Sequence, residues 1–147
     1  MRIEDTDRER SKKEYEESIL SGLHWLGLEP DETYRQSERA AIYNRYIQKL
    51  ISAGHAYQAE DGVIRFRNPN RIVTFADQLR GEINIDSTDL KDFVVARNDH
   101  EPLYNLAVVI DDHEMGITHV IRGDDGIANT PRQILLQAAI GAERPIY

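Results

Sequence analysis

The amino-acid sequence predicts an α/β fold, and three observations carry that prediction. Apolar residues recur at helical spacing in residues 15–26 and 42–50, and runs rich in β-branched residues lie between residues 63 and 97. From residue 103 to 141, a helix, a buried strand, a polar loop and a second helix are expected in that order. This order is typical of α/β proteins, which bind ligands at the carboxyl ends of their strands.

Two helices are expected before residue 55. Ser11 and Glu14 have the spacing of a capping box, in which each side chain bonds the free backbone N–H of the other residue. The helix that follows is expected to end at Gly27, and a second helix is expected from about Ser37 to Gly54. The apolar positions of the two helices are Tyr15, Ile19, Leu23 and Leu26, then Ile42 or Tyr43, Tyr46, Ile47 and Leu50.

Four strands are expected in the middle of the chain, because β-branched and aromatic residues there are bounded by turn residues. They are residues 63–67 (VIRFR), 71–75 (RIVTF), 82–86 (EINID) and 93–97 (FVVAR). Residues 103–116 have the β-branched content of a strand but the length of a helix. We interpret them as a helix, with Tyr104, Ala107, Val108 and Asp111 on one side.

The next segment joins a predicted strand to a predicted helix. Residues 118–121 are expected to form a buried strand. Thr130 and Gln133 have the spacing of a second capping box, with Pro131 at the first helical position and Gly141 as the end of the helix. The loop between the strand and the helix carries Arg122, Gly123, Asp124 and Asp125.

Two interpretations of this loop stay open on the pattern alone. Arg122 could bind a carboxylate or phosphate through a two-pronged hydrogen bond, and the two acids could bind a ribose hydroxyl, an amine or a metal-bound nucleotide. The acids could instead favour the N-terminus of the next helix, where negative charge contributes ~0.3–1 kcal/mol. They lie early for a helix that starts at Thr130, which favours a binding function.

The composition limits the classes of function. The 147 residues suit one domain and carry a formal net charge of −8. Only residues 8–13 are locally basic, whereas nucleic-acid binders usually carry a basic stripe. The sequence shows no signal peptide and no apolar run near the ~20 residues that span a bilayer. The absence of cysteine excludes disulfides and thiolate metal sites. We therefore expect a cytoplasmic protein with no membrane partner.

Two acidic clusters could bind cations. Glu4, Asp5 and Asp7 could hold an ammonium group or a metal, but the pattern alone favours a solvated charged edge. Residues 111–113 (DDH) could ligate a metal or could make surface and helix–helix contacts. The five histidines show no metal-ligand spacing, so we expect no structural zinc and no metal site.

Seven segments in order resemble the catalytic domain of bacterial glutamyl-tRNA synthetases. They are RIEDTDRERS, WLGLEPDE, YRQSER, RGEI, DFVVAR, LYNLAVVIDDHEMGITHVIRGDD and NTPRQILLQA. The likeness covers nearly the whole chain and is weakest over residues 59–78. It implies an α/β, Rossmann-like class I synthetase catalytic core, truncated, with a short inserted strand region. Residues 1–147 would then form a single partial domain, with the reduced insertion at about residues 58–97.

The resemblance also implies an activity. A glutamate–tRNA ligase activates glutamate with ATP, which binds together with Mg²⁺, and then transfers glutamate to tRNA(Glu). The glutamate carboxylate attacks the α-phosphorus of ATP, so positioning and charge stabilisation carry the step. Two alternatives stay open: a non-catalytic binding or interaction module derived from this fold, and a relative that glutamylates a tRNA base.

The resemblance assigns roles to individual residues. Arg122 corresponds to the arginine that binds the side-chain carboxylate of glutamate, Glu4 to the acid near its amino group, and Tyr104 to a tyrosine lining the pocket. We expect Tyr104 to face Arg122. The residues implied to face ATP are Asp125 and Asp124, and those implied to contact the tRNA acceptor end are Asp7, Arg10 and Arg97.

The sequence also departs from the family. The two phosphate-binding signature motifs, of the His-Ile-Gly-His and Lys-Met-Ser-Lys-Ser types, are absent from these 147 residues, so no catalytic residue is assigned. The isolated chain is expected to be weak or inactive in catalysis but to retain feeble glutamate recognition. Between Tyr57 and Val63 a short link replaces an insertion that is usual in the family, and Gly126 stands where histidine is usual.

Overall fold

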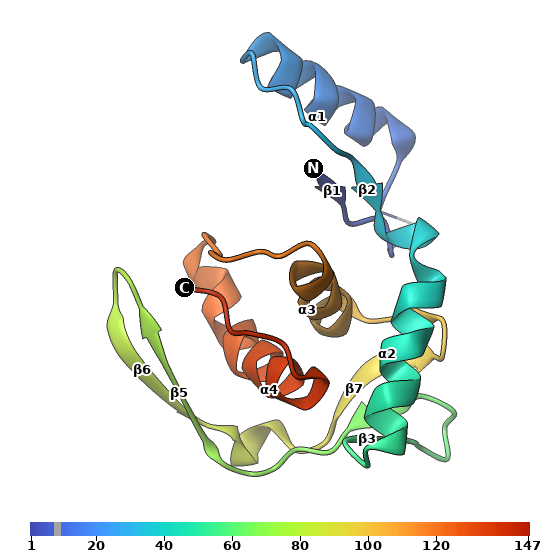
Figure 1. Cartoon of the computed structure of the whole chain (residues 1–147), viewed down its shortest axis with the longest axis vertical. Helices are drawn as coiled ribbons and strands as arrows, with labels where there is room; N and C mark the ends of the chain where they lie inside the picture. Colours follow the sequence, from blue (N-terminus) through green and yellow to red (C-terminus); the bar gives the residue numbers. More distant parts are fainter. Residues whose placement is uncertain (8–9) are drawn as a thin grey trace. The chain divides into compact units, whose positions relative to one another are not determined.

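A computed structural model describes residues 1–7 and 10–147 of the chain (Figure 1). The backbone divides into two compact units, Met1–Ile42 and Tyr43–Tyr147. Arg8 and Glu9, which belong to the basic run expected at residues 8–13, lie outside the described residues. Among the described residues, no helix combines the length and the apolar character that crossing a bilayer requires.

The first unit begins as a strand, a helix and a parallel strand. Strand β1 (Arg2–Ile3) pairs in parallel with β2 (Tyr34–Arg35), and α1 (Lys13–Trp25) connects them. Gly27 has a φ of +72° and the Leu28 N–H bonds the carbonyl of Leu23, so the expected helix end is confirmed. A 3₁₀ turn, η1 (Gln36–Glu38), delays the start of the second helix, α2 (Ala40–Ser52), beyond the expected Ser37.

The capping box expected at Ser11 and Glu14 is wrong. Helix α1 is preceded by Lys12, which is in extended conformation and makes no side-chain capping bond. The backbone N–H of Ser11 donates to the carbonyl of Asp7 at 2.9 Å, so Ser11 belongs to the turn before the helix. The position that must supply the cap is therefore occupied by a lysine, which cannot accept a hydrogen bond.

All four expected strands are confirmed in the second unit, in two antiparallel sheets. The first sheet has the order β3-β4-β7-β8, and the second is a two-stranded ribbon of β5 and β6. The strands are β3 (Ala56–Gln58), β4 (Ile64–Phe66), β5 (Ile72–Asp77), β6 (Gly81–Asp86), β7 (Phe93–Asn98) and β8 (Glu101–Pro102). In Figure 1 the β5–β6 ribbon extends as an arm that curves alongside α4.

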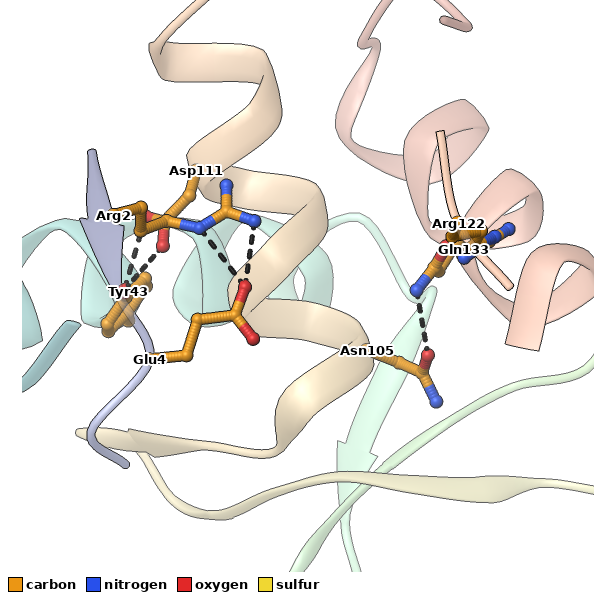
Figure 2. A network of polar contacts seen from close by, with 7 residues as sticks. All are labelled: Arg2, Glu4, Tyr43, Asn105, Asp111, Arg122 and Gln133. Carbon is orange, nitrogen blue, oxygen red and sulfur yellow. Dashed lines mark hydrogen bonds and ion pairs between the residues drawn. The ribbon is translucent and has the colours of Figure 1, made fainter. Parts of the chain in front are cut away.

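Helices α3 (Tyr104–Glu114) and α4 (Thr130–Ile140) pack side by side in the second unit, and the helical interpretation of residues 103–116 is confirmed. The expected apolar face of α2 is buried at Tyr43, Tyr46, Ile47 and Leu50. The Tyr43 hydroxyl donates to both carboxylate oxygens of the buried Asp111, at 2.9 and 3.1 Å (Figure 2). These contacts tie α2 to α3 within the unit.

The buried strand expected at residues 118–121 is wrong. The segment forms one isolated parallel bridge, between His119 and Ile146, and the side chain of Ile121 is 99% exposed. Val120 donates its N–H to the carbonyl of Ile146 at 2.8 Å, and Ile146 donates to Thr118 at 2.9 Å. Pairing at a single position does not cover a strand, which is why Ile121 stays in solvent.

The second capping box is also wrong, although Pro131 does lie in the first turn of α4 and Gly141, with a φ of +75°, ends that helix as expected. The residue before α4 is Asn129, whose backbone is already helical and whose side chain makes no capping bond. A 3₁₀ helix, η3 (Asp124–Asn129), leads directly into α4. The chain therefore enters α4 already wound, and Thr130 and Gln133 bond elsewhere.

Candidate functional site

Arg122 is the centre of a polar network at the start of α4. Its Nη1 donates to the Gln133 side-chain oxygen at 2.8 Å, and its Nη2 donates to the Thr130 hydroxyl. Thr130 and Gln133 are three residues apart and so share one face of α4. The two bonds use two of the five N–H donors of a guanidinium. Within the described residues no further hydrogen bond reaches Arg122, which leaves three donors for a ligand.

Gln133 connects Arg122 to α3. Its side chain is 5% exposed, and its Nε2 donates to the Asn105 side-chain oxygen at 3.1 Å (Figure 2). Asn105 lies in the first turn of α3, and its Nδ2 reaches the side-chain oxygen of Asn129 at 3.5 Å. The Gln133 amide therefore has a partner at each end, as a buried amide requires.

The stem of Arg122 lies against Gly126 of η3. A Cβ atom added at Gly126 would fall well inside van der Waals contact of the Arg122 Cδ and 3.0 Å from its Nε. The guanidinium carbon lies 5.4 Å from the centroid of the Tyr147 ring, within the range of a cation–π interaction. Burial raises the pKa of the Tyr147 hydroxyl, which bonds Gln137 at 3.1 Å. The absence of a side chain at Gly126 thus makes room for this conformation of Arg122.

The two acids of the loop point away from Arg122. Asp124 accepts an ion-pair hydrogen bond from Arg80, at the tip of the β5–β6 ribbon, and this bond raises the pKa of Arg80. The Asp125 carboxylate folds back over Gly123, where an added Cβ would lie 2.7 Å from its Oδ1. Both acids are exposed.

The tip of the β5–β6 ribbon is ordered by Asp77. Its carboxylate accepts the backbone N–H groups of Arg80 at 2.8 Å and Leu79 at 2.9 Å, and these bonds lower the pKa of Asp77. A cavity of about 60 Å³ is lined by the tip and by Arg122 and Asp124. It has room for about two water molecules and is too small for an amino acid.

The other residues singled out from the sequence lie in both units. In the second unit, Tyr104 is the first residue of α3, 47% exposed and adjacent to Asn105, and Arg97 is exposed on β7. In the first unit, Glu4 accepts a hydrogen bond from Arg2 at 2.9 Å (Figure 2). Asp7 and Arg10 form an exposed ion pair at 2.7 Å.

The segment DDH at residues 111–113 has structural partners. Asp111 is fully buried and accepts from the Tyr43 hydroxyl, and the His113 ring packs edge-on to Tyr46 at 6.2 Å between centroids. Over residues 1–7 and 10–147, no group of three histidine, aspartate or glutamate side chains is arranged to hold a metal ion. The segment therefore serves helix packing.

Sequence reasoning missed three residues that contact or support Arg122: Thr130, Gln133 and Asn105. Thr130 and Gln133 were assigned to a helix cap, and that assignment hid their second possible role. The signal was the position of two polar residues on one face of the first turn of a helix, directly after a loop that carries an arginine. Nothing local in the sequence links Asn105 to Gln133, which lies 28 positions away.

The chain combines a β1-α1-β2 start with an arginine-bearing loop before α4, and its similarity to known proteins identifies the class to which it belongs. The chain belongs to the family described as "tRNA synthetases class I (E and Q), catalytic domain", whose model matches residues 1–62 and 58–147. It is 50% identical to glutamate–tRNA ligase 1 of Rubrobacter xylanophilus and 44% identical to the glutamate–tRNA ligase of Hydrogenobaculum sp.. Both matches cover the whole of this chain, and 35% and 41% of the respective relatives.

A crystal structure supports the same family. The glutamate tRNA ligase of Elizabethkingia meningosepticum, in complex with its amino acid, superposes with a TM-score of 0.90 at 32% identity. The superposition covers 99% of this chain and 41% of that one. The fold is thus that of a class I synthetase catalytic domain, and the chain spans about two fifths of the length of these relatives.

The lengths of the alignments vary between relatives. The Hydrogenobaculum alignment extends over 190 residues and the Rubrobacter alignment over 152, against 147 in this chain. The two parts of the family match overlap at residues 58–62, which are the last residue of β3 and the turn that follows it. The family match is thus divided at this turn.

Proposed function

We propose that this chain supplies the amino-acid recognition part of a glutamate–tRNA ligase, which activates glutamate with ATP and transfers it to tRNA(Glu). In this proposal Arg122 binds the side-chain carboxylate of glutamate and Tyr104 lines the same pocket. Glu4 is proposed to pair with the ammonium group of the substrate. Membership of the family of class I tRNA synthetases for glutamate and glutamine supports the proposal.

The observation that carries the proposal is the state of the Arg122 guanidinium. Two neutral oxygen atoms, of Gln133 and Thr130, hold its terminal nitrogens, and no carboxylate of the described residues bonds it. The guanidinium therefore keeps its full charge and three N–H donors while its direction is fixed. A carboxylate is the ligand that best matches a guanidinium with free donors, because it accepts two parallel hydrogen bonds.

The remaining roles concern ATP and tRNA. Asp125 and Asp124 are proposed to face ATP, which enters with Mg²⁺ as the substrate complex and supplies the α-phosphorus that the glutamate carboxylate attacks. Asp124 must release Arg80 to take this role, because the two side chains are paired. Asp7, Arg10 and Arg97 are proposed contacts of the tRNA acceptor end. The chain's own contribution to the chemistry is to hold and orient the amino acid.

The test is glutamate binding, measured by calorimetry on the purified protein and its variants. Arg122→Lys should weaken binding about tenfold or more, because a point charge cannot form the two-pronged bond. Arg132→Lys is the matched control: Arg132 lies on α4, and among the described residues its side chain donates to the Ala128 carbonyl and lies over the Phe93 ring. This variant should bind glutamate normally. Equal affinity of the unsubstituted protein and Arg122→Lys would remove Arg122 from the site.

A second measurement separates an enzyme from a binding module. Glutamate-dependent exchange of pyrophosphate into ATP requires adenylate formation, whereas glutamate binding alone does not. Exchange that is lost on Arg122→Met but retained in Arg132→Lys supports the ligase. Glutamate binding with little or no exchange is the result expected of these 147 residues by themselves, because the two phosphate-binding motifs are absent from them.

A further inference from the structure

We infer that Gln133 is a positioning residue that fixes the direction of Arg122, and that Asn105 determines which way the Gln133 amide points. The inference rests on the proposed function, because it concerns how Arg122 is prepared for a carboxylate. It is carried by the network that runs from α3 through α4 to the loop before η3.

The orientation of the Gln133 amide has only one satisfactory solution. With its oxygen toward Arg122 and its NH₂ toward the Asn105 oxygen, both ends are bonded, at 2.8 and 3.1 Å. A flipped amide would place its NH₂ against a guanidinium N–H and its oxygen against the Asn105 oxygen. Both contacts would be repulsive, and the side chain is buried, so water could not replace the lost bonds.

Two anchors are enough to fix a planar group. Gln133 holds one terminal nitrogen of Arg122 and Thr130 holds the other, and both anchors stand on the rigid first turns of α4. The Arg122 stem lies against Gly126 and the guanidinium lies over the Tyr147 ring. The remaining N–H donors therefore point in a fixed direction before a ligand arrives, and less conformational entropy is lost on binding.

The chemistry of the anchor matters as much as its geometry. An amide oxygen orients the guanidinium but leaves its charge uncompensated, whereas a carboxylate at the same position would pair with that charge. Gln133 thus orients Arg122 and preserves its attraction for a negatively charged side chain. The consequence is selectivity for glutamate over its neutral isostere, glutamine.

The experiment compares Gln133→Leu and Gln133→Glu in the purified protein. The quantities are the dissociation constant of glutamate and the inhibition constant of glutamine against it. Gln133→Leu removes the anchor and should weaken glutamate binding roughly tenfold or more. Gln133→Glu should lower the preference for glutamate over glutamine at least as far, because the new carboxylate competes for Arg122.

Gln137→Leu is the matched control. Gln137 lies one turn further along α4, is equally buried at 5% exposure, and bonds the Tyr147 hydroxyl instead of the guanidinium. This variant should show a similar change in Tm but keep the ratio of the two constants. If Gln133 only supports the fold, its variants should weaken the binding of glutamate and of glutamine by the same factor, as damage to α4 would. That result would overturn the inference.

The outcomes separate this inference from the proposed function. If Arg122→Lys leaves glutamate binding unchanged, the proposed function fails and the inference fails with it. If Arg122→Lys weakens binding while both Gln133 variants keep the affinity and the preference, only the positioning role is wrong. Asn105→Ala should weaken glutamate binding by less than Gln133→Leu does. A larger effect than that of Gln133→Leu would contradict the proposal that Asn105 acts on Arg122 through Gln133.

Discussion

The spacing of a capping box, two polar residues three positions apart, occurs twice in this chain, and the two pairs form different contacts. Ser11 precedes α1 and Glu14 lies in its first turn, both with exposed side chains, whereas Thr130 and Gln133 open α4 with side chains 1% and 5% exposed. Neither pair forms a capping box. Exposed polar side chains can be solvated, and Glu14 also pairs with Lys12 at 3.9 Å, whereas the buried pair must find protein partners and bonds Arg122. Burial, and not the spacing, decides what such residues do.

The largest effect is expected from Thr130→Val, which replaces the buried hydroxyl with a methyl group of similar size. The variant leaves a half-buried guanidinium N–H without its acceptor and should lower the free energy of unfolding by about 1–3 kcal/mol. Urea denaturation measures the change. Combining it with Arg122→Met should recover part of the loss, because no donor then remains unpaired. Strictly additive effects would show that the hydroxyl and the guanidinium are not coupled.

Gly126→Ala tests the space that the Arg122 stem occupies. The new methyl group would overlap the Arg122 Cδ, so the arginine must leave its two anchors. We expect a loss of about 1 kcal/mol, at the low end for overpacking because the stem is flexible. Thermal unfolding followed by circular dichroism measures it. The same substitution in an Arg122→Ala background should be close to neutral, and an undiminished loss there would place the strain in the backbone of η3.

Ser11→Ala probes the exposed copy of the pattern. Because Ser11 makes no capping bond and its backbone belongs to the preceding turn, the free energy of unfolding should change by less than about 0.5 kcal/mol. A functioning cap would typically contribute ~1 kcal/mol. A loss of about 1 kcal/mol in urea denaturation would show that Ser11 does cap α1.

Asp77 differs from the two pairs above, because its side chain does accept hydrogen bonds from nearby backbone N–H groups. The N–H groups of Arg80 and Leu79 lower its pKa, so its contribution is present above its ordinary pKa and is lost as the pH falls through the lowered value. Acidification below about pH 4 should therefore loosen the β5–β6 tip first. Amide exchange protection of Leu79 and Arg80 measures this. Asp77→Asn, which keeps an oxygen acceptor, should retain most of the protection at all pH values.

Much of the fold follows from the spacing of apolar residues. The buried face of α2 at Tyr43, Tyr46, Ile47 and Leu50 and the four central strands were predictable, because each pattern extends over several residues and one period dominates. Residues 118–121 have the composition of a strand, but pairing depends on a neighbour, and this segment meets its neighbour at one position. A composition rich in β-branched residues cannot reveal how many partners a segment finds.

The candidate site was predictable only in its central residue. Arg122 stands out because three charged residues, Arg122, Asp124 and Asp125, follow an apolar run. Its proposed role came from the resemblance to the synthetases. The support of Arg122 is tertiary: Asn105 and Gln133 come from different helices, and Gly126 matters because of an atom it lacks. Such relations depend on distances across the fold, which neither local propensity nor periodicity encodes.

The turn between β3 and β4 closes tightly, with the Ala59 N–H bonded to the Val63 carbonyl at 2.8 Å and Gly62 at a φ of +84°. Since the ends of the two strands already lie side by side, a folded segment spliced in here would need only its own termini close together, and lengthening a loop adds little closure entropy. The hairpin is thus a natural splice point, where an entire domain could be gained or lost without disturbing the sheet beneath it.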